Sequence, residues 1–126
     1  ACRMQNPVMF MEHKGLYRQG FAASPEPDKK YLLPFGKAER VEEGEAITIV
    51  TWGALVQKSK EAVRNKGVSA DIIDLRTLNP LDMETILTSV KKTNRLLIAH
   101  EDNVTGGFGA EIAARIISEG FQYLDQ

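Results

Sequence analysis

From residue 36 onward, short apolar and β-branched runs alternate with segments whose apolar residues recur at helical spacing. This alternation is typical of strand–helix–strand units, and it constrains the fold more than any other feature of the chain. Three runs predict strands, over 46–52, 69–75 and 95–100. Because these runs are apolar on both faces, we expect a mostly parallel sheet with right-handed crossovers and helices on both sides. The sequence therefore predicts an α/β domain of three layers.

The segments between and after these runs predict three helices, and residues 37–41 predict a short edge strand. The first helix covers 53–66 and is expected to end at Gly67. Asp82 is expected to cap the second, because its carboxylate can accept hydrogen bonds from the free N–H groups of the first turn. The residues expected to face the sheet are Leu55, Val56, Ala62 and Val63 in the first helix, Met83, Ile86, Leu87 and Val90 in the second, and Ile112, Ala113, Ile116 and Ile117 in the third.

Residues 1–35 differ from the rest in composition, since they hold four of the five prolines. Prolines and glycines at this density are typical of a connection rather than of a packed element. Residues 7–12 alone predict a strand. We therefore expect 1–14 to carry the last strand of an upstream domain and 15–35 to link two domains. Residues 36–126 would form the second domain, truncated at its end.

Composition argues against several classes of protein. The 16 Lys and Arg residues nearly balance the 17 Asp and Glu residues, giving a net charge of −1, whereas nucleic-acid-binding modules usually carry a basic excess. The single cysteine, Cys2, cannot form an internal disulfide, which fits a reducing compartment. No apolar run is long enough to span a bilayer. We expect neither nucleic acid nor a membrane as a partner.

A glycine-rich turn follows the third predicted strand and contains Gly106, Gly107 and Gly109. Backbone N–H groups at the start of the following helix can bind an anion. However, the glycine spacing matches neither the dinucleotide fingerprint nor the phosphate-binding loop, and Glu111 in the first helical turn would repel a phosphate. We favour a tight turn that needs close backbone approach, with ligand contact as the alternative.

His100 and Glu101 precede this turn at the carboxyl end of the third predicted strand. A histidine beside carboxylates can act as a proton shuttle. The interpretation we favour is a histidine that makes a hydrogen bond at a strand end or a domain interface. The chain has two His and one Cys, which is distant in sequence from His100, so no zinc site is supported. The residues alone predict an α/β domain without an evident self-contained active site.

Several blocks of sequence resemble one family, in order along the chain. They are 6–18, 33–38, 48–53, 73–82, 89–93 and 100–112, and the most specific are I-D-L-R-T…P-L-D and H-E…T-G-G-F-G-A-E-I. The blocks resemble the β part of the thiamine-diphosphate-dependent 2-oxo acid dehydrogenases. They run from the end of its pyrimidine-binding domain through its transketolase-type carboxyl-terminal domain. The resemblance covers nearly the whole chain.

The resemblance implies a parent enzyme that decarboxylates a 2-oxo acid and acylates lipoyl groups. Thiamine diphosphate and magnesium would lie between the α part and the pyrimidine-binding domain. We therefore expect no catalytic, cofactor-binding or metal-binding residue in this chain, and no activity of the chain alone. The carboxyl-terminal domain would serve subunit assembly and docking. The candidate interface or ligand turn consists of His100, Glu101, Gly106, Gly107 and Gly109.

The partners that the resemblance implies are the α part, a second β part and the lipoyl-bearing acyltransferase core. Residues 51–53 and the His100–Glu101 block favour a branched-chain substrate, 2-oxoisovalerate, over pyruvate. A non-catalytic interaction domain and a sister enzyme of the transketolase superfamily are the alternatives. The expected location is the cytoplasm of a bacterium or, in a eukaryote, the mitochondrial matrix.

Overall fold

The computed structural model describes residues 1–125. The chain divides into two compact units, Ala1–Lys30 and Tyr31–Gln126. The first unit contains two single-turn 3-10 helices, η1 (Lys14–Leu16) and η2 (Gly20–Ala22). The strand predicted over 7–12 is absent, so that prediction is wrong for this structure. A strand exists only through hydrogen bonds to a neighbour, and no described strand pairs with this segment. Its extended, apolar sequence was therefore an insufficient signal.

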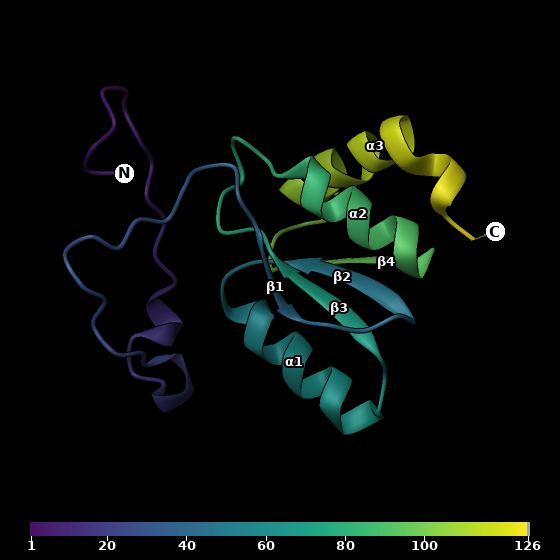
Figure 1. Ribbon diagram of the computed structural model, residues 1–126, viewed down its shortest axis with the longest axis horizontal. Helices are drawn as coiled ribbons and strands as arrows, with labels where there is room; N and C mark the ends of the chain where they lie inside the picture. The colour runs from purple at the N-terminus through teal and green to yellow at the C-terminus, as the bar shows by residue number, and fades with distance from the viewer. Residues whose placement is uncertain (126) are drawn as a thin grey trace. The chain divides into compact units, whose positions relative to one another are not determined.

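The second unit alternates strands and helices as the sequence predicts (Figure 1). Each predicted strand and helix forms within two residues of its expected bounds. The elements are β1 (Glu39–Glu42), β2 (Ile47–Thr51), α1 (Ala54–Lys66), β3 (Ala70–Asp74), α2 (Met83–Thr93), β4 (Leu96–Ala99), α3 (Phe108–Gly120) and the 3-10 turn η3 (Phe121–Tyr123).

The four strands form one sheet in the order β1-β3-β2-β4. Strand β2 pairs in parallel with both β3 and β4, so that Val50 lies opposite Ile73 on one side and Ile98 on the other. Strand β1 is the predicted edge strand and runs antiparallel to β3. The sheet is therefore mostly parallel, as expected, and the carboxyl ends of β2, β3 and β4 meet at one edge.

Helices cover both faces of the sheet, which confirms the three-layer prediction. In Figure 1, α1 lies below the sheet and α2 and α3 lie above it. The larger core lies on the side of α2 and α3, and the smaller one on the side of α1. The buried residues of the larger core are Val50, Ile73, Leu75, Met83, Ile86, Val90, Ile112 and Ile116. Those of the smaller core are Ile49, Ala70 and Ile72.

The helix ends follow the signals in the sequence. The side chain of Asp82 accepts a hydrogen bond from the backbone N–H of Thr85 at 3.1 Å, which confirms the predicted cap of α2. Gly67 follows α1 in the left-handed region at φ +63°, where a residue without Cβ is favoured. Within residues 1–125, none of the helices combines the length and the apolar character that crossing a bilayer requires.

The expected inward face of two helices was partly wrong. Ile112 and Ile116 of α3 are fully buried, but Ile117 is 53% exposed. Successive helical residues are about 100° apart, so a residue next to a buried one can already point away from the sheet. Ala62 of α1 is likewise exposed. A prediction from apolar character alone therefore made the buried faces of α1 and α3 wider than they are.

Candidate functional site

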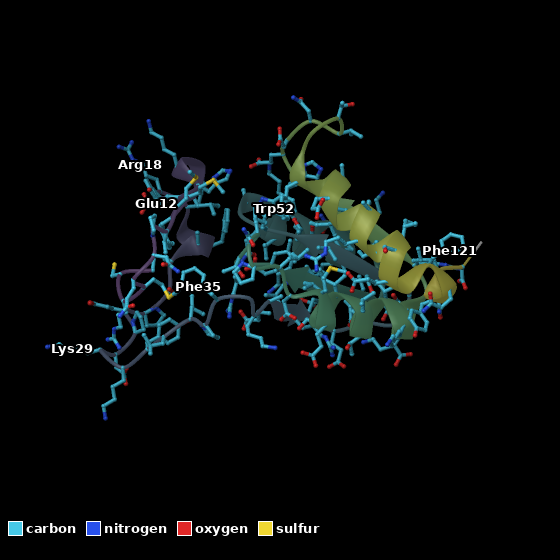
Figure 2. All side chains as sticks on the ribbon, turned by 90° about the horizontal axis from the view of Figure 1, so that it is seen from above. Glu12, Arg18, Lys29, Phe35, Trp52 and Phe121 are labelled. Atoms are coloured by element: carbon cyan, nitrogen blue, oxygen red, sulfur yellow. The ribbon has the colours of Figure 1, made fainter. Side chains whose placement is uncertain are left out.

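Three aromatic side chains meet at the carboxyl edge of the parallel strands. Trp52 follows β2, His100 follows β4 and Phe108 begins α3. The rings of Trp52 and His100 are stacked, with centroids 5.4 Å apart and planes 9° from parallel. Phe108 meets Trp52 edge to face at 6.2 Å. Both arrangements are favoured by the charge distribution of aromatic rings, so they fix the imidazole against the sheet. Figure 2 labels Trp52 at this end of the second unit.

The glycine-rich turn packs directly on this imidazole. A Cβ added at Gly109 would lie 2.3 Å from Nε2 of His100, and one at Gly107 would lie 2.1 Å from the backbone O of Asn103. Both positions therefore need glycine for space. Gly106 has open surroundings but a φ of +79°, so it needs glycine for its backbone conformation. This geometry supports the tight-turn interpretation of the sequence, because the turn closes on His100 rather than around an open anion site.

The structure brings the five candidate residues to one edge of the sheet. Glu101 lies 3.6 Å from Nζ of Lys58 on α1, an ion pair between exposed side chains. Asp102 accepts a hydrogen bond from the backbone N–H of Asn103 at 2.7 Å. Nδ1 of His100 is buried without a hydrogen-bond partner among the described residues. The ring stacks on Trp52, and the hydrogen bond that the favoured interpretation expects from this histidine stays a prediction.

The end of β3 contributes a second feature of this edge. Asp74 accepts a hydrogen bond from the backbone N–H of Arg76 at 3.2 Å. Burial raises the pKa of the Asp74 carboxyl, and this hydrogen bond offsets only part of the rise. Arg76 adopts a left-handed φ of +55°, and its guanidinium pairs with Glu39 of β1. The turn after β3 is thus tied to the edge strand.

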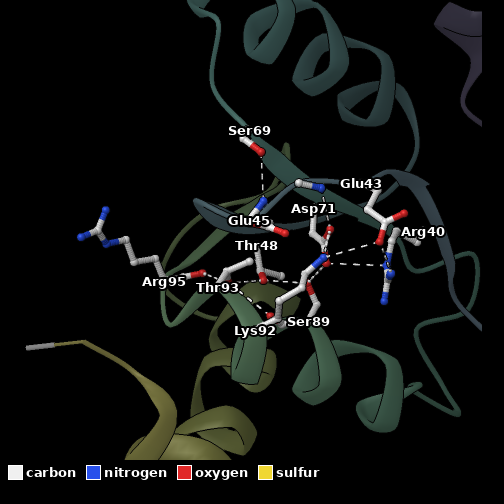
Figure 3. A network of polar contacts seen from close by, with 11 residues as sticks. Arg40, Glu43, Glu45, Thr48, Ser69, Asp71, Ser89, Lys92, Thr93 and Arg95 are labelled. Carbon is white, nitrogen blue, oxygen red and sulfur yellow. Dashed lines mark hydrogen bonds and ion pairs between the residues drawn. The ribbon is translucent and has the colours of Figure 1, made fainter.

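Sequence reasoning missed a buried polar network at the opposite end of the sheet (Figure 3). The fully buried carboxylate of Asp71 accepts hydrogen bonds from the backbone N–H of Gly44 at 2.8 Å, from Ser89 at 2.7 Å and from Lys92 at 2.7 Å. Nε of Arg40 lies 3.6 Å away. Burial alone would raise the pKa of Asp71. The hydrogen bonds and the Arg40 charge outweigh it and hold the pKa below its ordinary value.

The network continues through three hydroxyl groups between β2 and α2. Oγ1 of Thr48 lies 2.7 Å from Oγ of Ser89 and 2.6 Å from Oγ1 of Thr93. Thr93 also donates to the backbone O of Arg95 at 3.1 Å. Every polar group of this chain of contacts has a partner, so the network joins β1, β2, β3 and α2 rather than offering a ligand site. The predicted strand over 69–75 includes Asp71, but only the fold reveals its partners.

These contacts define what the described residues can do chemically. Within residues 1–125, no group of three or more His, Cys, Asp or Glu side chains is placed to hold a metal ion. The carboxyl edge offers a surface of stacked rings and a closely packed turn.

The second unit has a mostly parallel sheet, with α1 on one face and α2 and α3 on the other. This arrangement belongs to the α/β class. The transketolase C-terminal domain family matches residues 36–126, and the chain belongs to this family. Both the family resemblance and the transketolase-type fold predicted from the sequence are thereby confirmed.

Relatives with known names agree with this family. The chain is 50% identical over 128 residues to "2-oxoisovalerate dehydrogenase subunit beta 2, mitochondrial" of Arabidopsis thaliana, which covers 99% of the chain and 35% of that protein. It is 43% identical to "Pyruvate dehydrogenase E1 component subunit beta, mitochondrial" of Dictyostelium discoideum, over 99% of the chain and 36% of that protein. The chain therefore spans roughly a third of the length of these relatives.

A solved structure shows the same fold. It is described as "Split gene transketolase, inactive beta4 tetramer", and it superimposes with a TM-score of 0.64 at 27% sequence identity. The likeness covers 76% of this chain and 33% of that one.

Proposed function

We propose that this chain is part of the β subunit of a thiamine-diphosphate-dependent 2-oxo acid dehydrogenase. The observation that carries the proposal is the 50% identity to a 2-oxoisovalerate dehydrogenase β subunit over 99% of the chain. The parent enzyme oxidatively decarboxylates a 2-oxo acid and transfers the acyl group to lipoyl groups. Residues 1–14 end its upstream domain, 15–35 link the domains, and 36–126 form the carboxyl-terminal domain.

Branched-chain 2-oxo acids are the proposed substrates. The relative named for 2-oxoisovalerate in Arabidopsis thaliana is 50% identical to the chain, whereas the pyruvate dehydrogenase β subunits of Dictyostelium discoideum and Rickettsia conorii are each 43% identical. The Trp52–His100 stack supports the same choice, because it unites the two sequence blocks that favoured a branched-chain enzyme. A pyruvate dehydrogenase β subunit is the second candidate.

The proposed role of this portion is assembly rather than chemistry. Its partners are the α part, a second β part and the lipoyl-bearing acyltransferase core. His100, Glu101, Gly106, Gly107 and Gly109 form the contact edge, since the stack and the closed turn give it a fixed shape. The enzyme acts in a bacterial cytoplasm or in a mitochondrial matrix.

Thiamine diphosphate and magnesium belong to other portions of the parent enzyme in this proposal. The described residues do not fit either group. The start of α3, where a diphosphate could meet free N–H groups, is packed on the imidazole of His100. No acidic or histidine cluster placed for a metal occurs within residues 1–125. We expect the chain alone to be inactive.

The test is reconstitution of the parent enzyme. The full parent β subunit, of which this chain is the proposed carboxyl-terminal portion, is co-expressed with its own α part. Decarboxylation of 2-oxoisovalerate and of pyruvate is then compared with transfer of the two-carbon unit of a ketose phosphate to an aldose phosphate acceptor. We expect 2-oxoisovalerate to give the highest kcat/KM. A preference for pyruvate supports the second candidate, and turnover of the ketose phosphate alone overturns the proposal in favour of a transketolase-type enzyme.

A separate arm tests whether the domain contributes only contacts. In the reconstituted enzyme, Gly107→Val should disturb the closed turn and reduce recovery of the α–β complex on gel filtration. Val104→Ser, at an 86% exposed position of the same loop, is the matched control. Normal assembly and turnover of the Gly107→Val enzyme would remove the turn from the proposed contact edge.

A further inference from the structure

The surroundings of the His100 imidazole fit its neutral form. Its Nδ1 is buried and has no hydrogen-bond partner among the described residues. A neutral imidazole carries a proton on only one of its two nitrogens, so Nδ1 can remain without one. Protonation of the ring would place an N–H at Nδ1 with no acceptor among the described residues. A buried donor of this kind costs roughly 5- to 150-fold in an equilibrium constant, and more when the group is charged.

The amino end of α3 acts in the same direction. The Nε2 edge of the ring packs on the first turn of this helix, where a Cβ added at Gly109 would lie 2.3 Å from Nε2. The N–H groups of a first helical turn have no partner within the helix and carry partial positive charge. The cap residue, Gly107, has no side chain that could compensate this charge. The helix end therefore repels a positive charge on the imidazole.

Charged side chains on the elements packed against the ring have a smaller effect. They are Lys58 of α1, Glu101 and Asp102 of the loop after β4, and Glu111 in the first turn of α3. Glu101 lies 3.6 Å from Nζ of Lys58, so its charge is already paired. Asp102 and Glu111 are exposed, and salt water screens charges at such positions. These two carboxylates therefore stabilise a protonated His100 only weakly.

The stack on Trp52 acts in the opposite direction, because the face of an aromatic ring attracts a cation. This attraction favours the protonated ring by roughly 2- to 30-fold, which is less than the combined effect of the buried Nδ1 and the helix end. The carboxylate of Asp74, at the end of β3, lies one strand further away, across β2. It accepts a hydrogen bond from the backbone N–H of Arg76 at 3.2 Å. The balance of these contacts favours the neutral imidazole.

We propose that His100 is a pH-sensitive switch, whose neutral imidazole holds the turn over 101–107 closed and whose protonation releases it. A Cβ added at Gly107 would lie 2.9 Å from Cε1 of the ring, so the turn rests on the imidazole and loses its support when the ring leaves the stack. Histidine ordinarily changes charge between pH 5 and pH 8, which sets the range of the switch. The switch belongs to the fold of this chain and goes beyond the proposed function. Only its effect on subunit assembly, through the contact edge, rests on that function.

The first experiment observes the stack through Trp52, the single tryptophan of the chain. Its fluorescence, recorded from pH 8 to pH 5, should change in one transition that follows the binding of one proton, while far-UV circular dichroism stays that of a folded chain. His100→Gln carries a neutral amide that does not titrate, so its fluorescence should stay constant. His13→Gln removes the other histidine and should keep the transition. The absence of a transition in the original chain, or its persistence in His100→Gln, overturns the proposal.

The second experiment measures the linked loss of stability by urea denaturation at pH 8, 7, 6 and 5. The unfolded chain binds the proton that the closed fold excludes, so the equilibrium constant for folding should fall by up to about tenfold per pH unit toward pH 5. His100→Gln should be less stable at pH 8 and should nevertheless show a smaller slope, which a purely structural role of the ring would not produce. His13→Gln should keep the original slope.

Asp74 cannot produce the same result, because its raised pKa makes stability fall as pH rises. Equal slopes in the original chain and in His100→Gln overturn the proposal. Both experiments use this chain without the α part or substrate. Their failure would therefore leave the proposed dehydrogenase function intact, and a failed reconstitution would leave the switch intact.

Discussion

At the scale of single residues, the imidazole of His100 determines which residue types its neighbours can be. Stacking on Trp52 fixes the ring, and the first turn of α3 then approaches it closely enough to exclude a Cβ at Gly109. The glycines of this turn are thus explained by packing at two positions and by backbone conformation at a third. A motif that resembles an anion site in sequence is a packing motif in the structure.

Gly109→Ala should destabilise the second unit by roughly 1–3 kcal/mol, because its Cβ would overlap Nε2 of His100. Urea denaturation followed by circular dichroism measures the loss. His100→Ala removes the obstacle, so adding Gly109→Ala to that variant should cost much less than it costs in the original chain. Equal costs in the two backgrounds would show that the ring does not limit this position.

Removing the charge of Asp71 and removing that of Asp74, both in β3, should have different effects on the free energy of unfolding. The pKa of Asp71 is lowered, so its carboxylate stabilises the fold above the unfolded pKa, and this contribution disappears as pH falls through the folded pKa. The pKa of Asp74 is raised by burial, so its contribution is present at low pH and is lost as pH rises through the folded pKa. Asp71→Asn should therefore cost roughly 1–3 kcal/mol at neutral pH. Asp74→Asn should be neutral or stabilising there.

Thermal unfolding between pH 3 and pH 7 measures both variants. The destabilisation by Asp71→Asn should shrink toward the acid end, because the original carboxylate is then protonated too. Asp74→Asn serves as the matched control, being the same substitution in the same strand. A neutral effect of Asp71→Asn at pH 7 would contradict the role assigned to the buried network.

At the scale of elements, the parts predictable from sequence are those with local causes. The apolar runs of β2, β3 and β4 and the cap at Asp82 depend on residues close together in the chain. The Asp71 network escaped prediction because Arg40, Gly44, Ser89 and Lys92 reach it from β1, the following turn and α2. The missing strand at 7–12 and the outward Ile117 have the same cause. Each depends on what lies beside the element, which periodicity does not reveal.

Asp82 joins two elements, so removing its carboxylate should destabilise the fold more than removing an ordinary helix cap does. Besides capping α2, its carboxylate accepts a hydrogen bond from the backbone N–H of Ala38 at 2.9 Å, before β1 begins. Asp82→Ala should lower the free energy of unfolding by about 2 kcal/mol, the upper part of the range for caps. Asp82→Asn keeps one acceptor oxygen, which can still cap the N–H of Thr85, but places an amide NH2 where the second oxygen accepts from the N–H of Ala38. It should therefore lose less than Asp82→Ala. Chemical denaturation of both variants decides, and equal losses would show that the retained cap oxygen contributes nothing.

At the scale of the whole molecule, the core and the polar network lie entirely within residues 31–125. None of the residues 1–30 is buried, whereas β1 pairs with β3 and supplies Arg40 to Asp71. A chain lacking residues 1–30 should therefore unfold cooperatively, with a Tm within about 4 °C of the full chain, which corresponds to less than about 1 kcal/mol. A chain lacking residues 1–42 loses β1 and exposes the edge of β3, so its cooperative transition should be lost or strongly lowered. Calorimetry on the three chains measures this. If deletion of residues 1–30 already abolished the transition, folding of the second unit would depend on the first. The two units would then not fold independently.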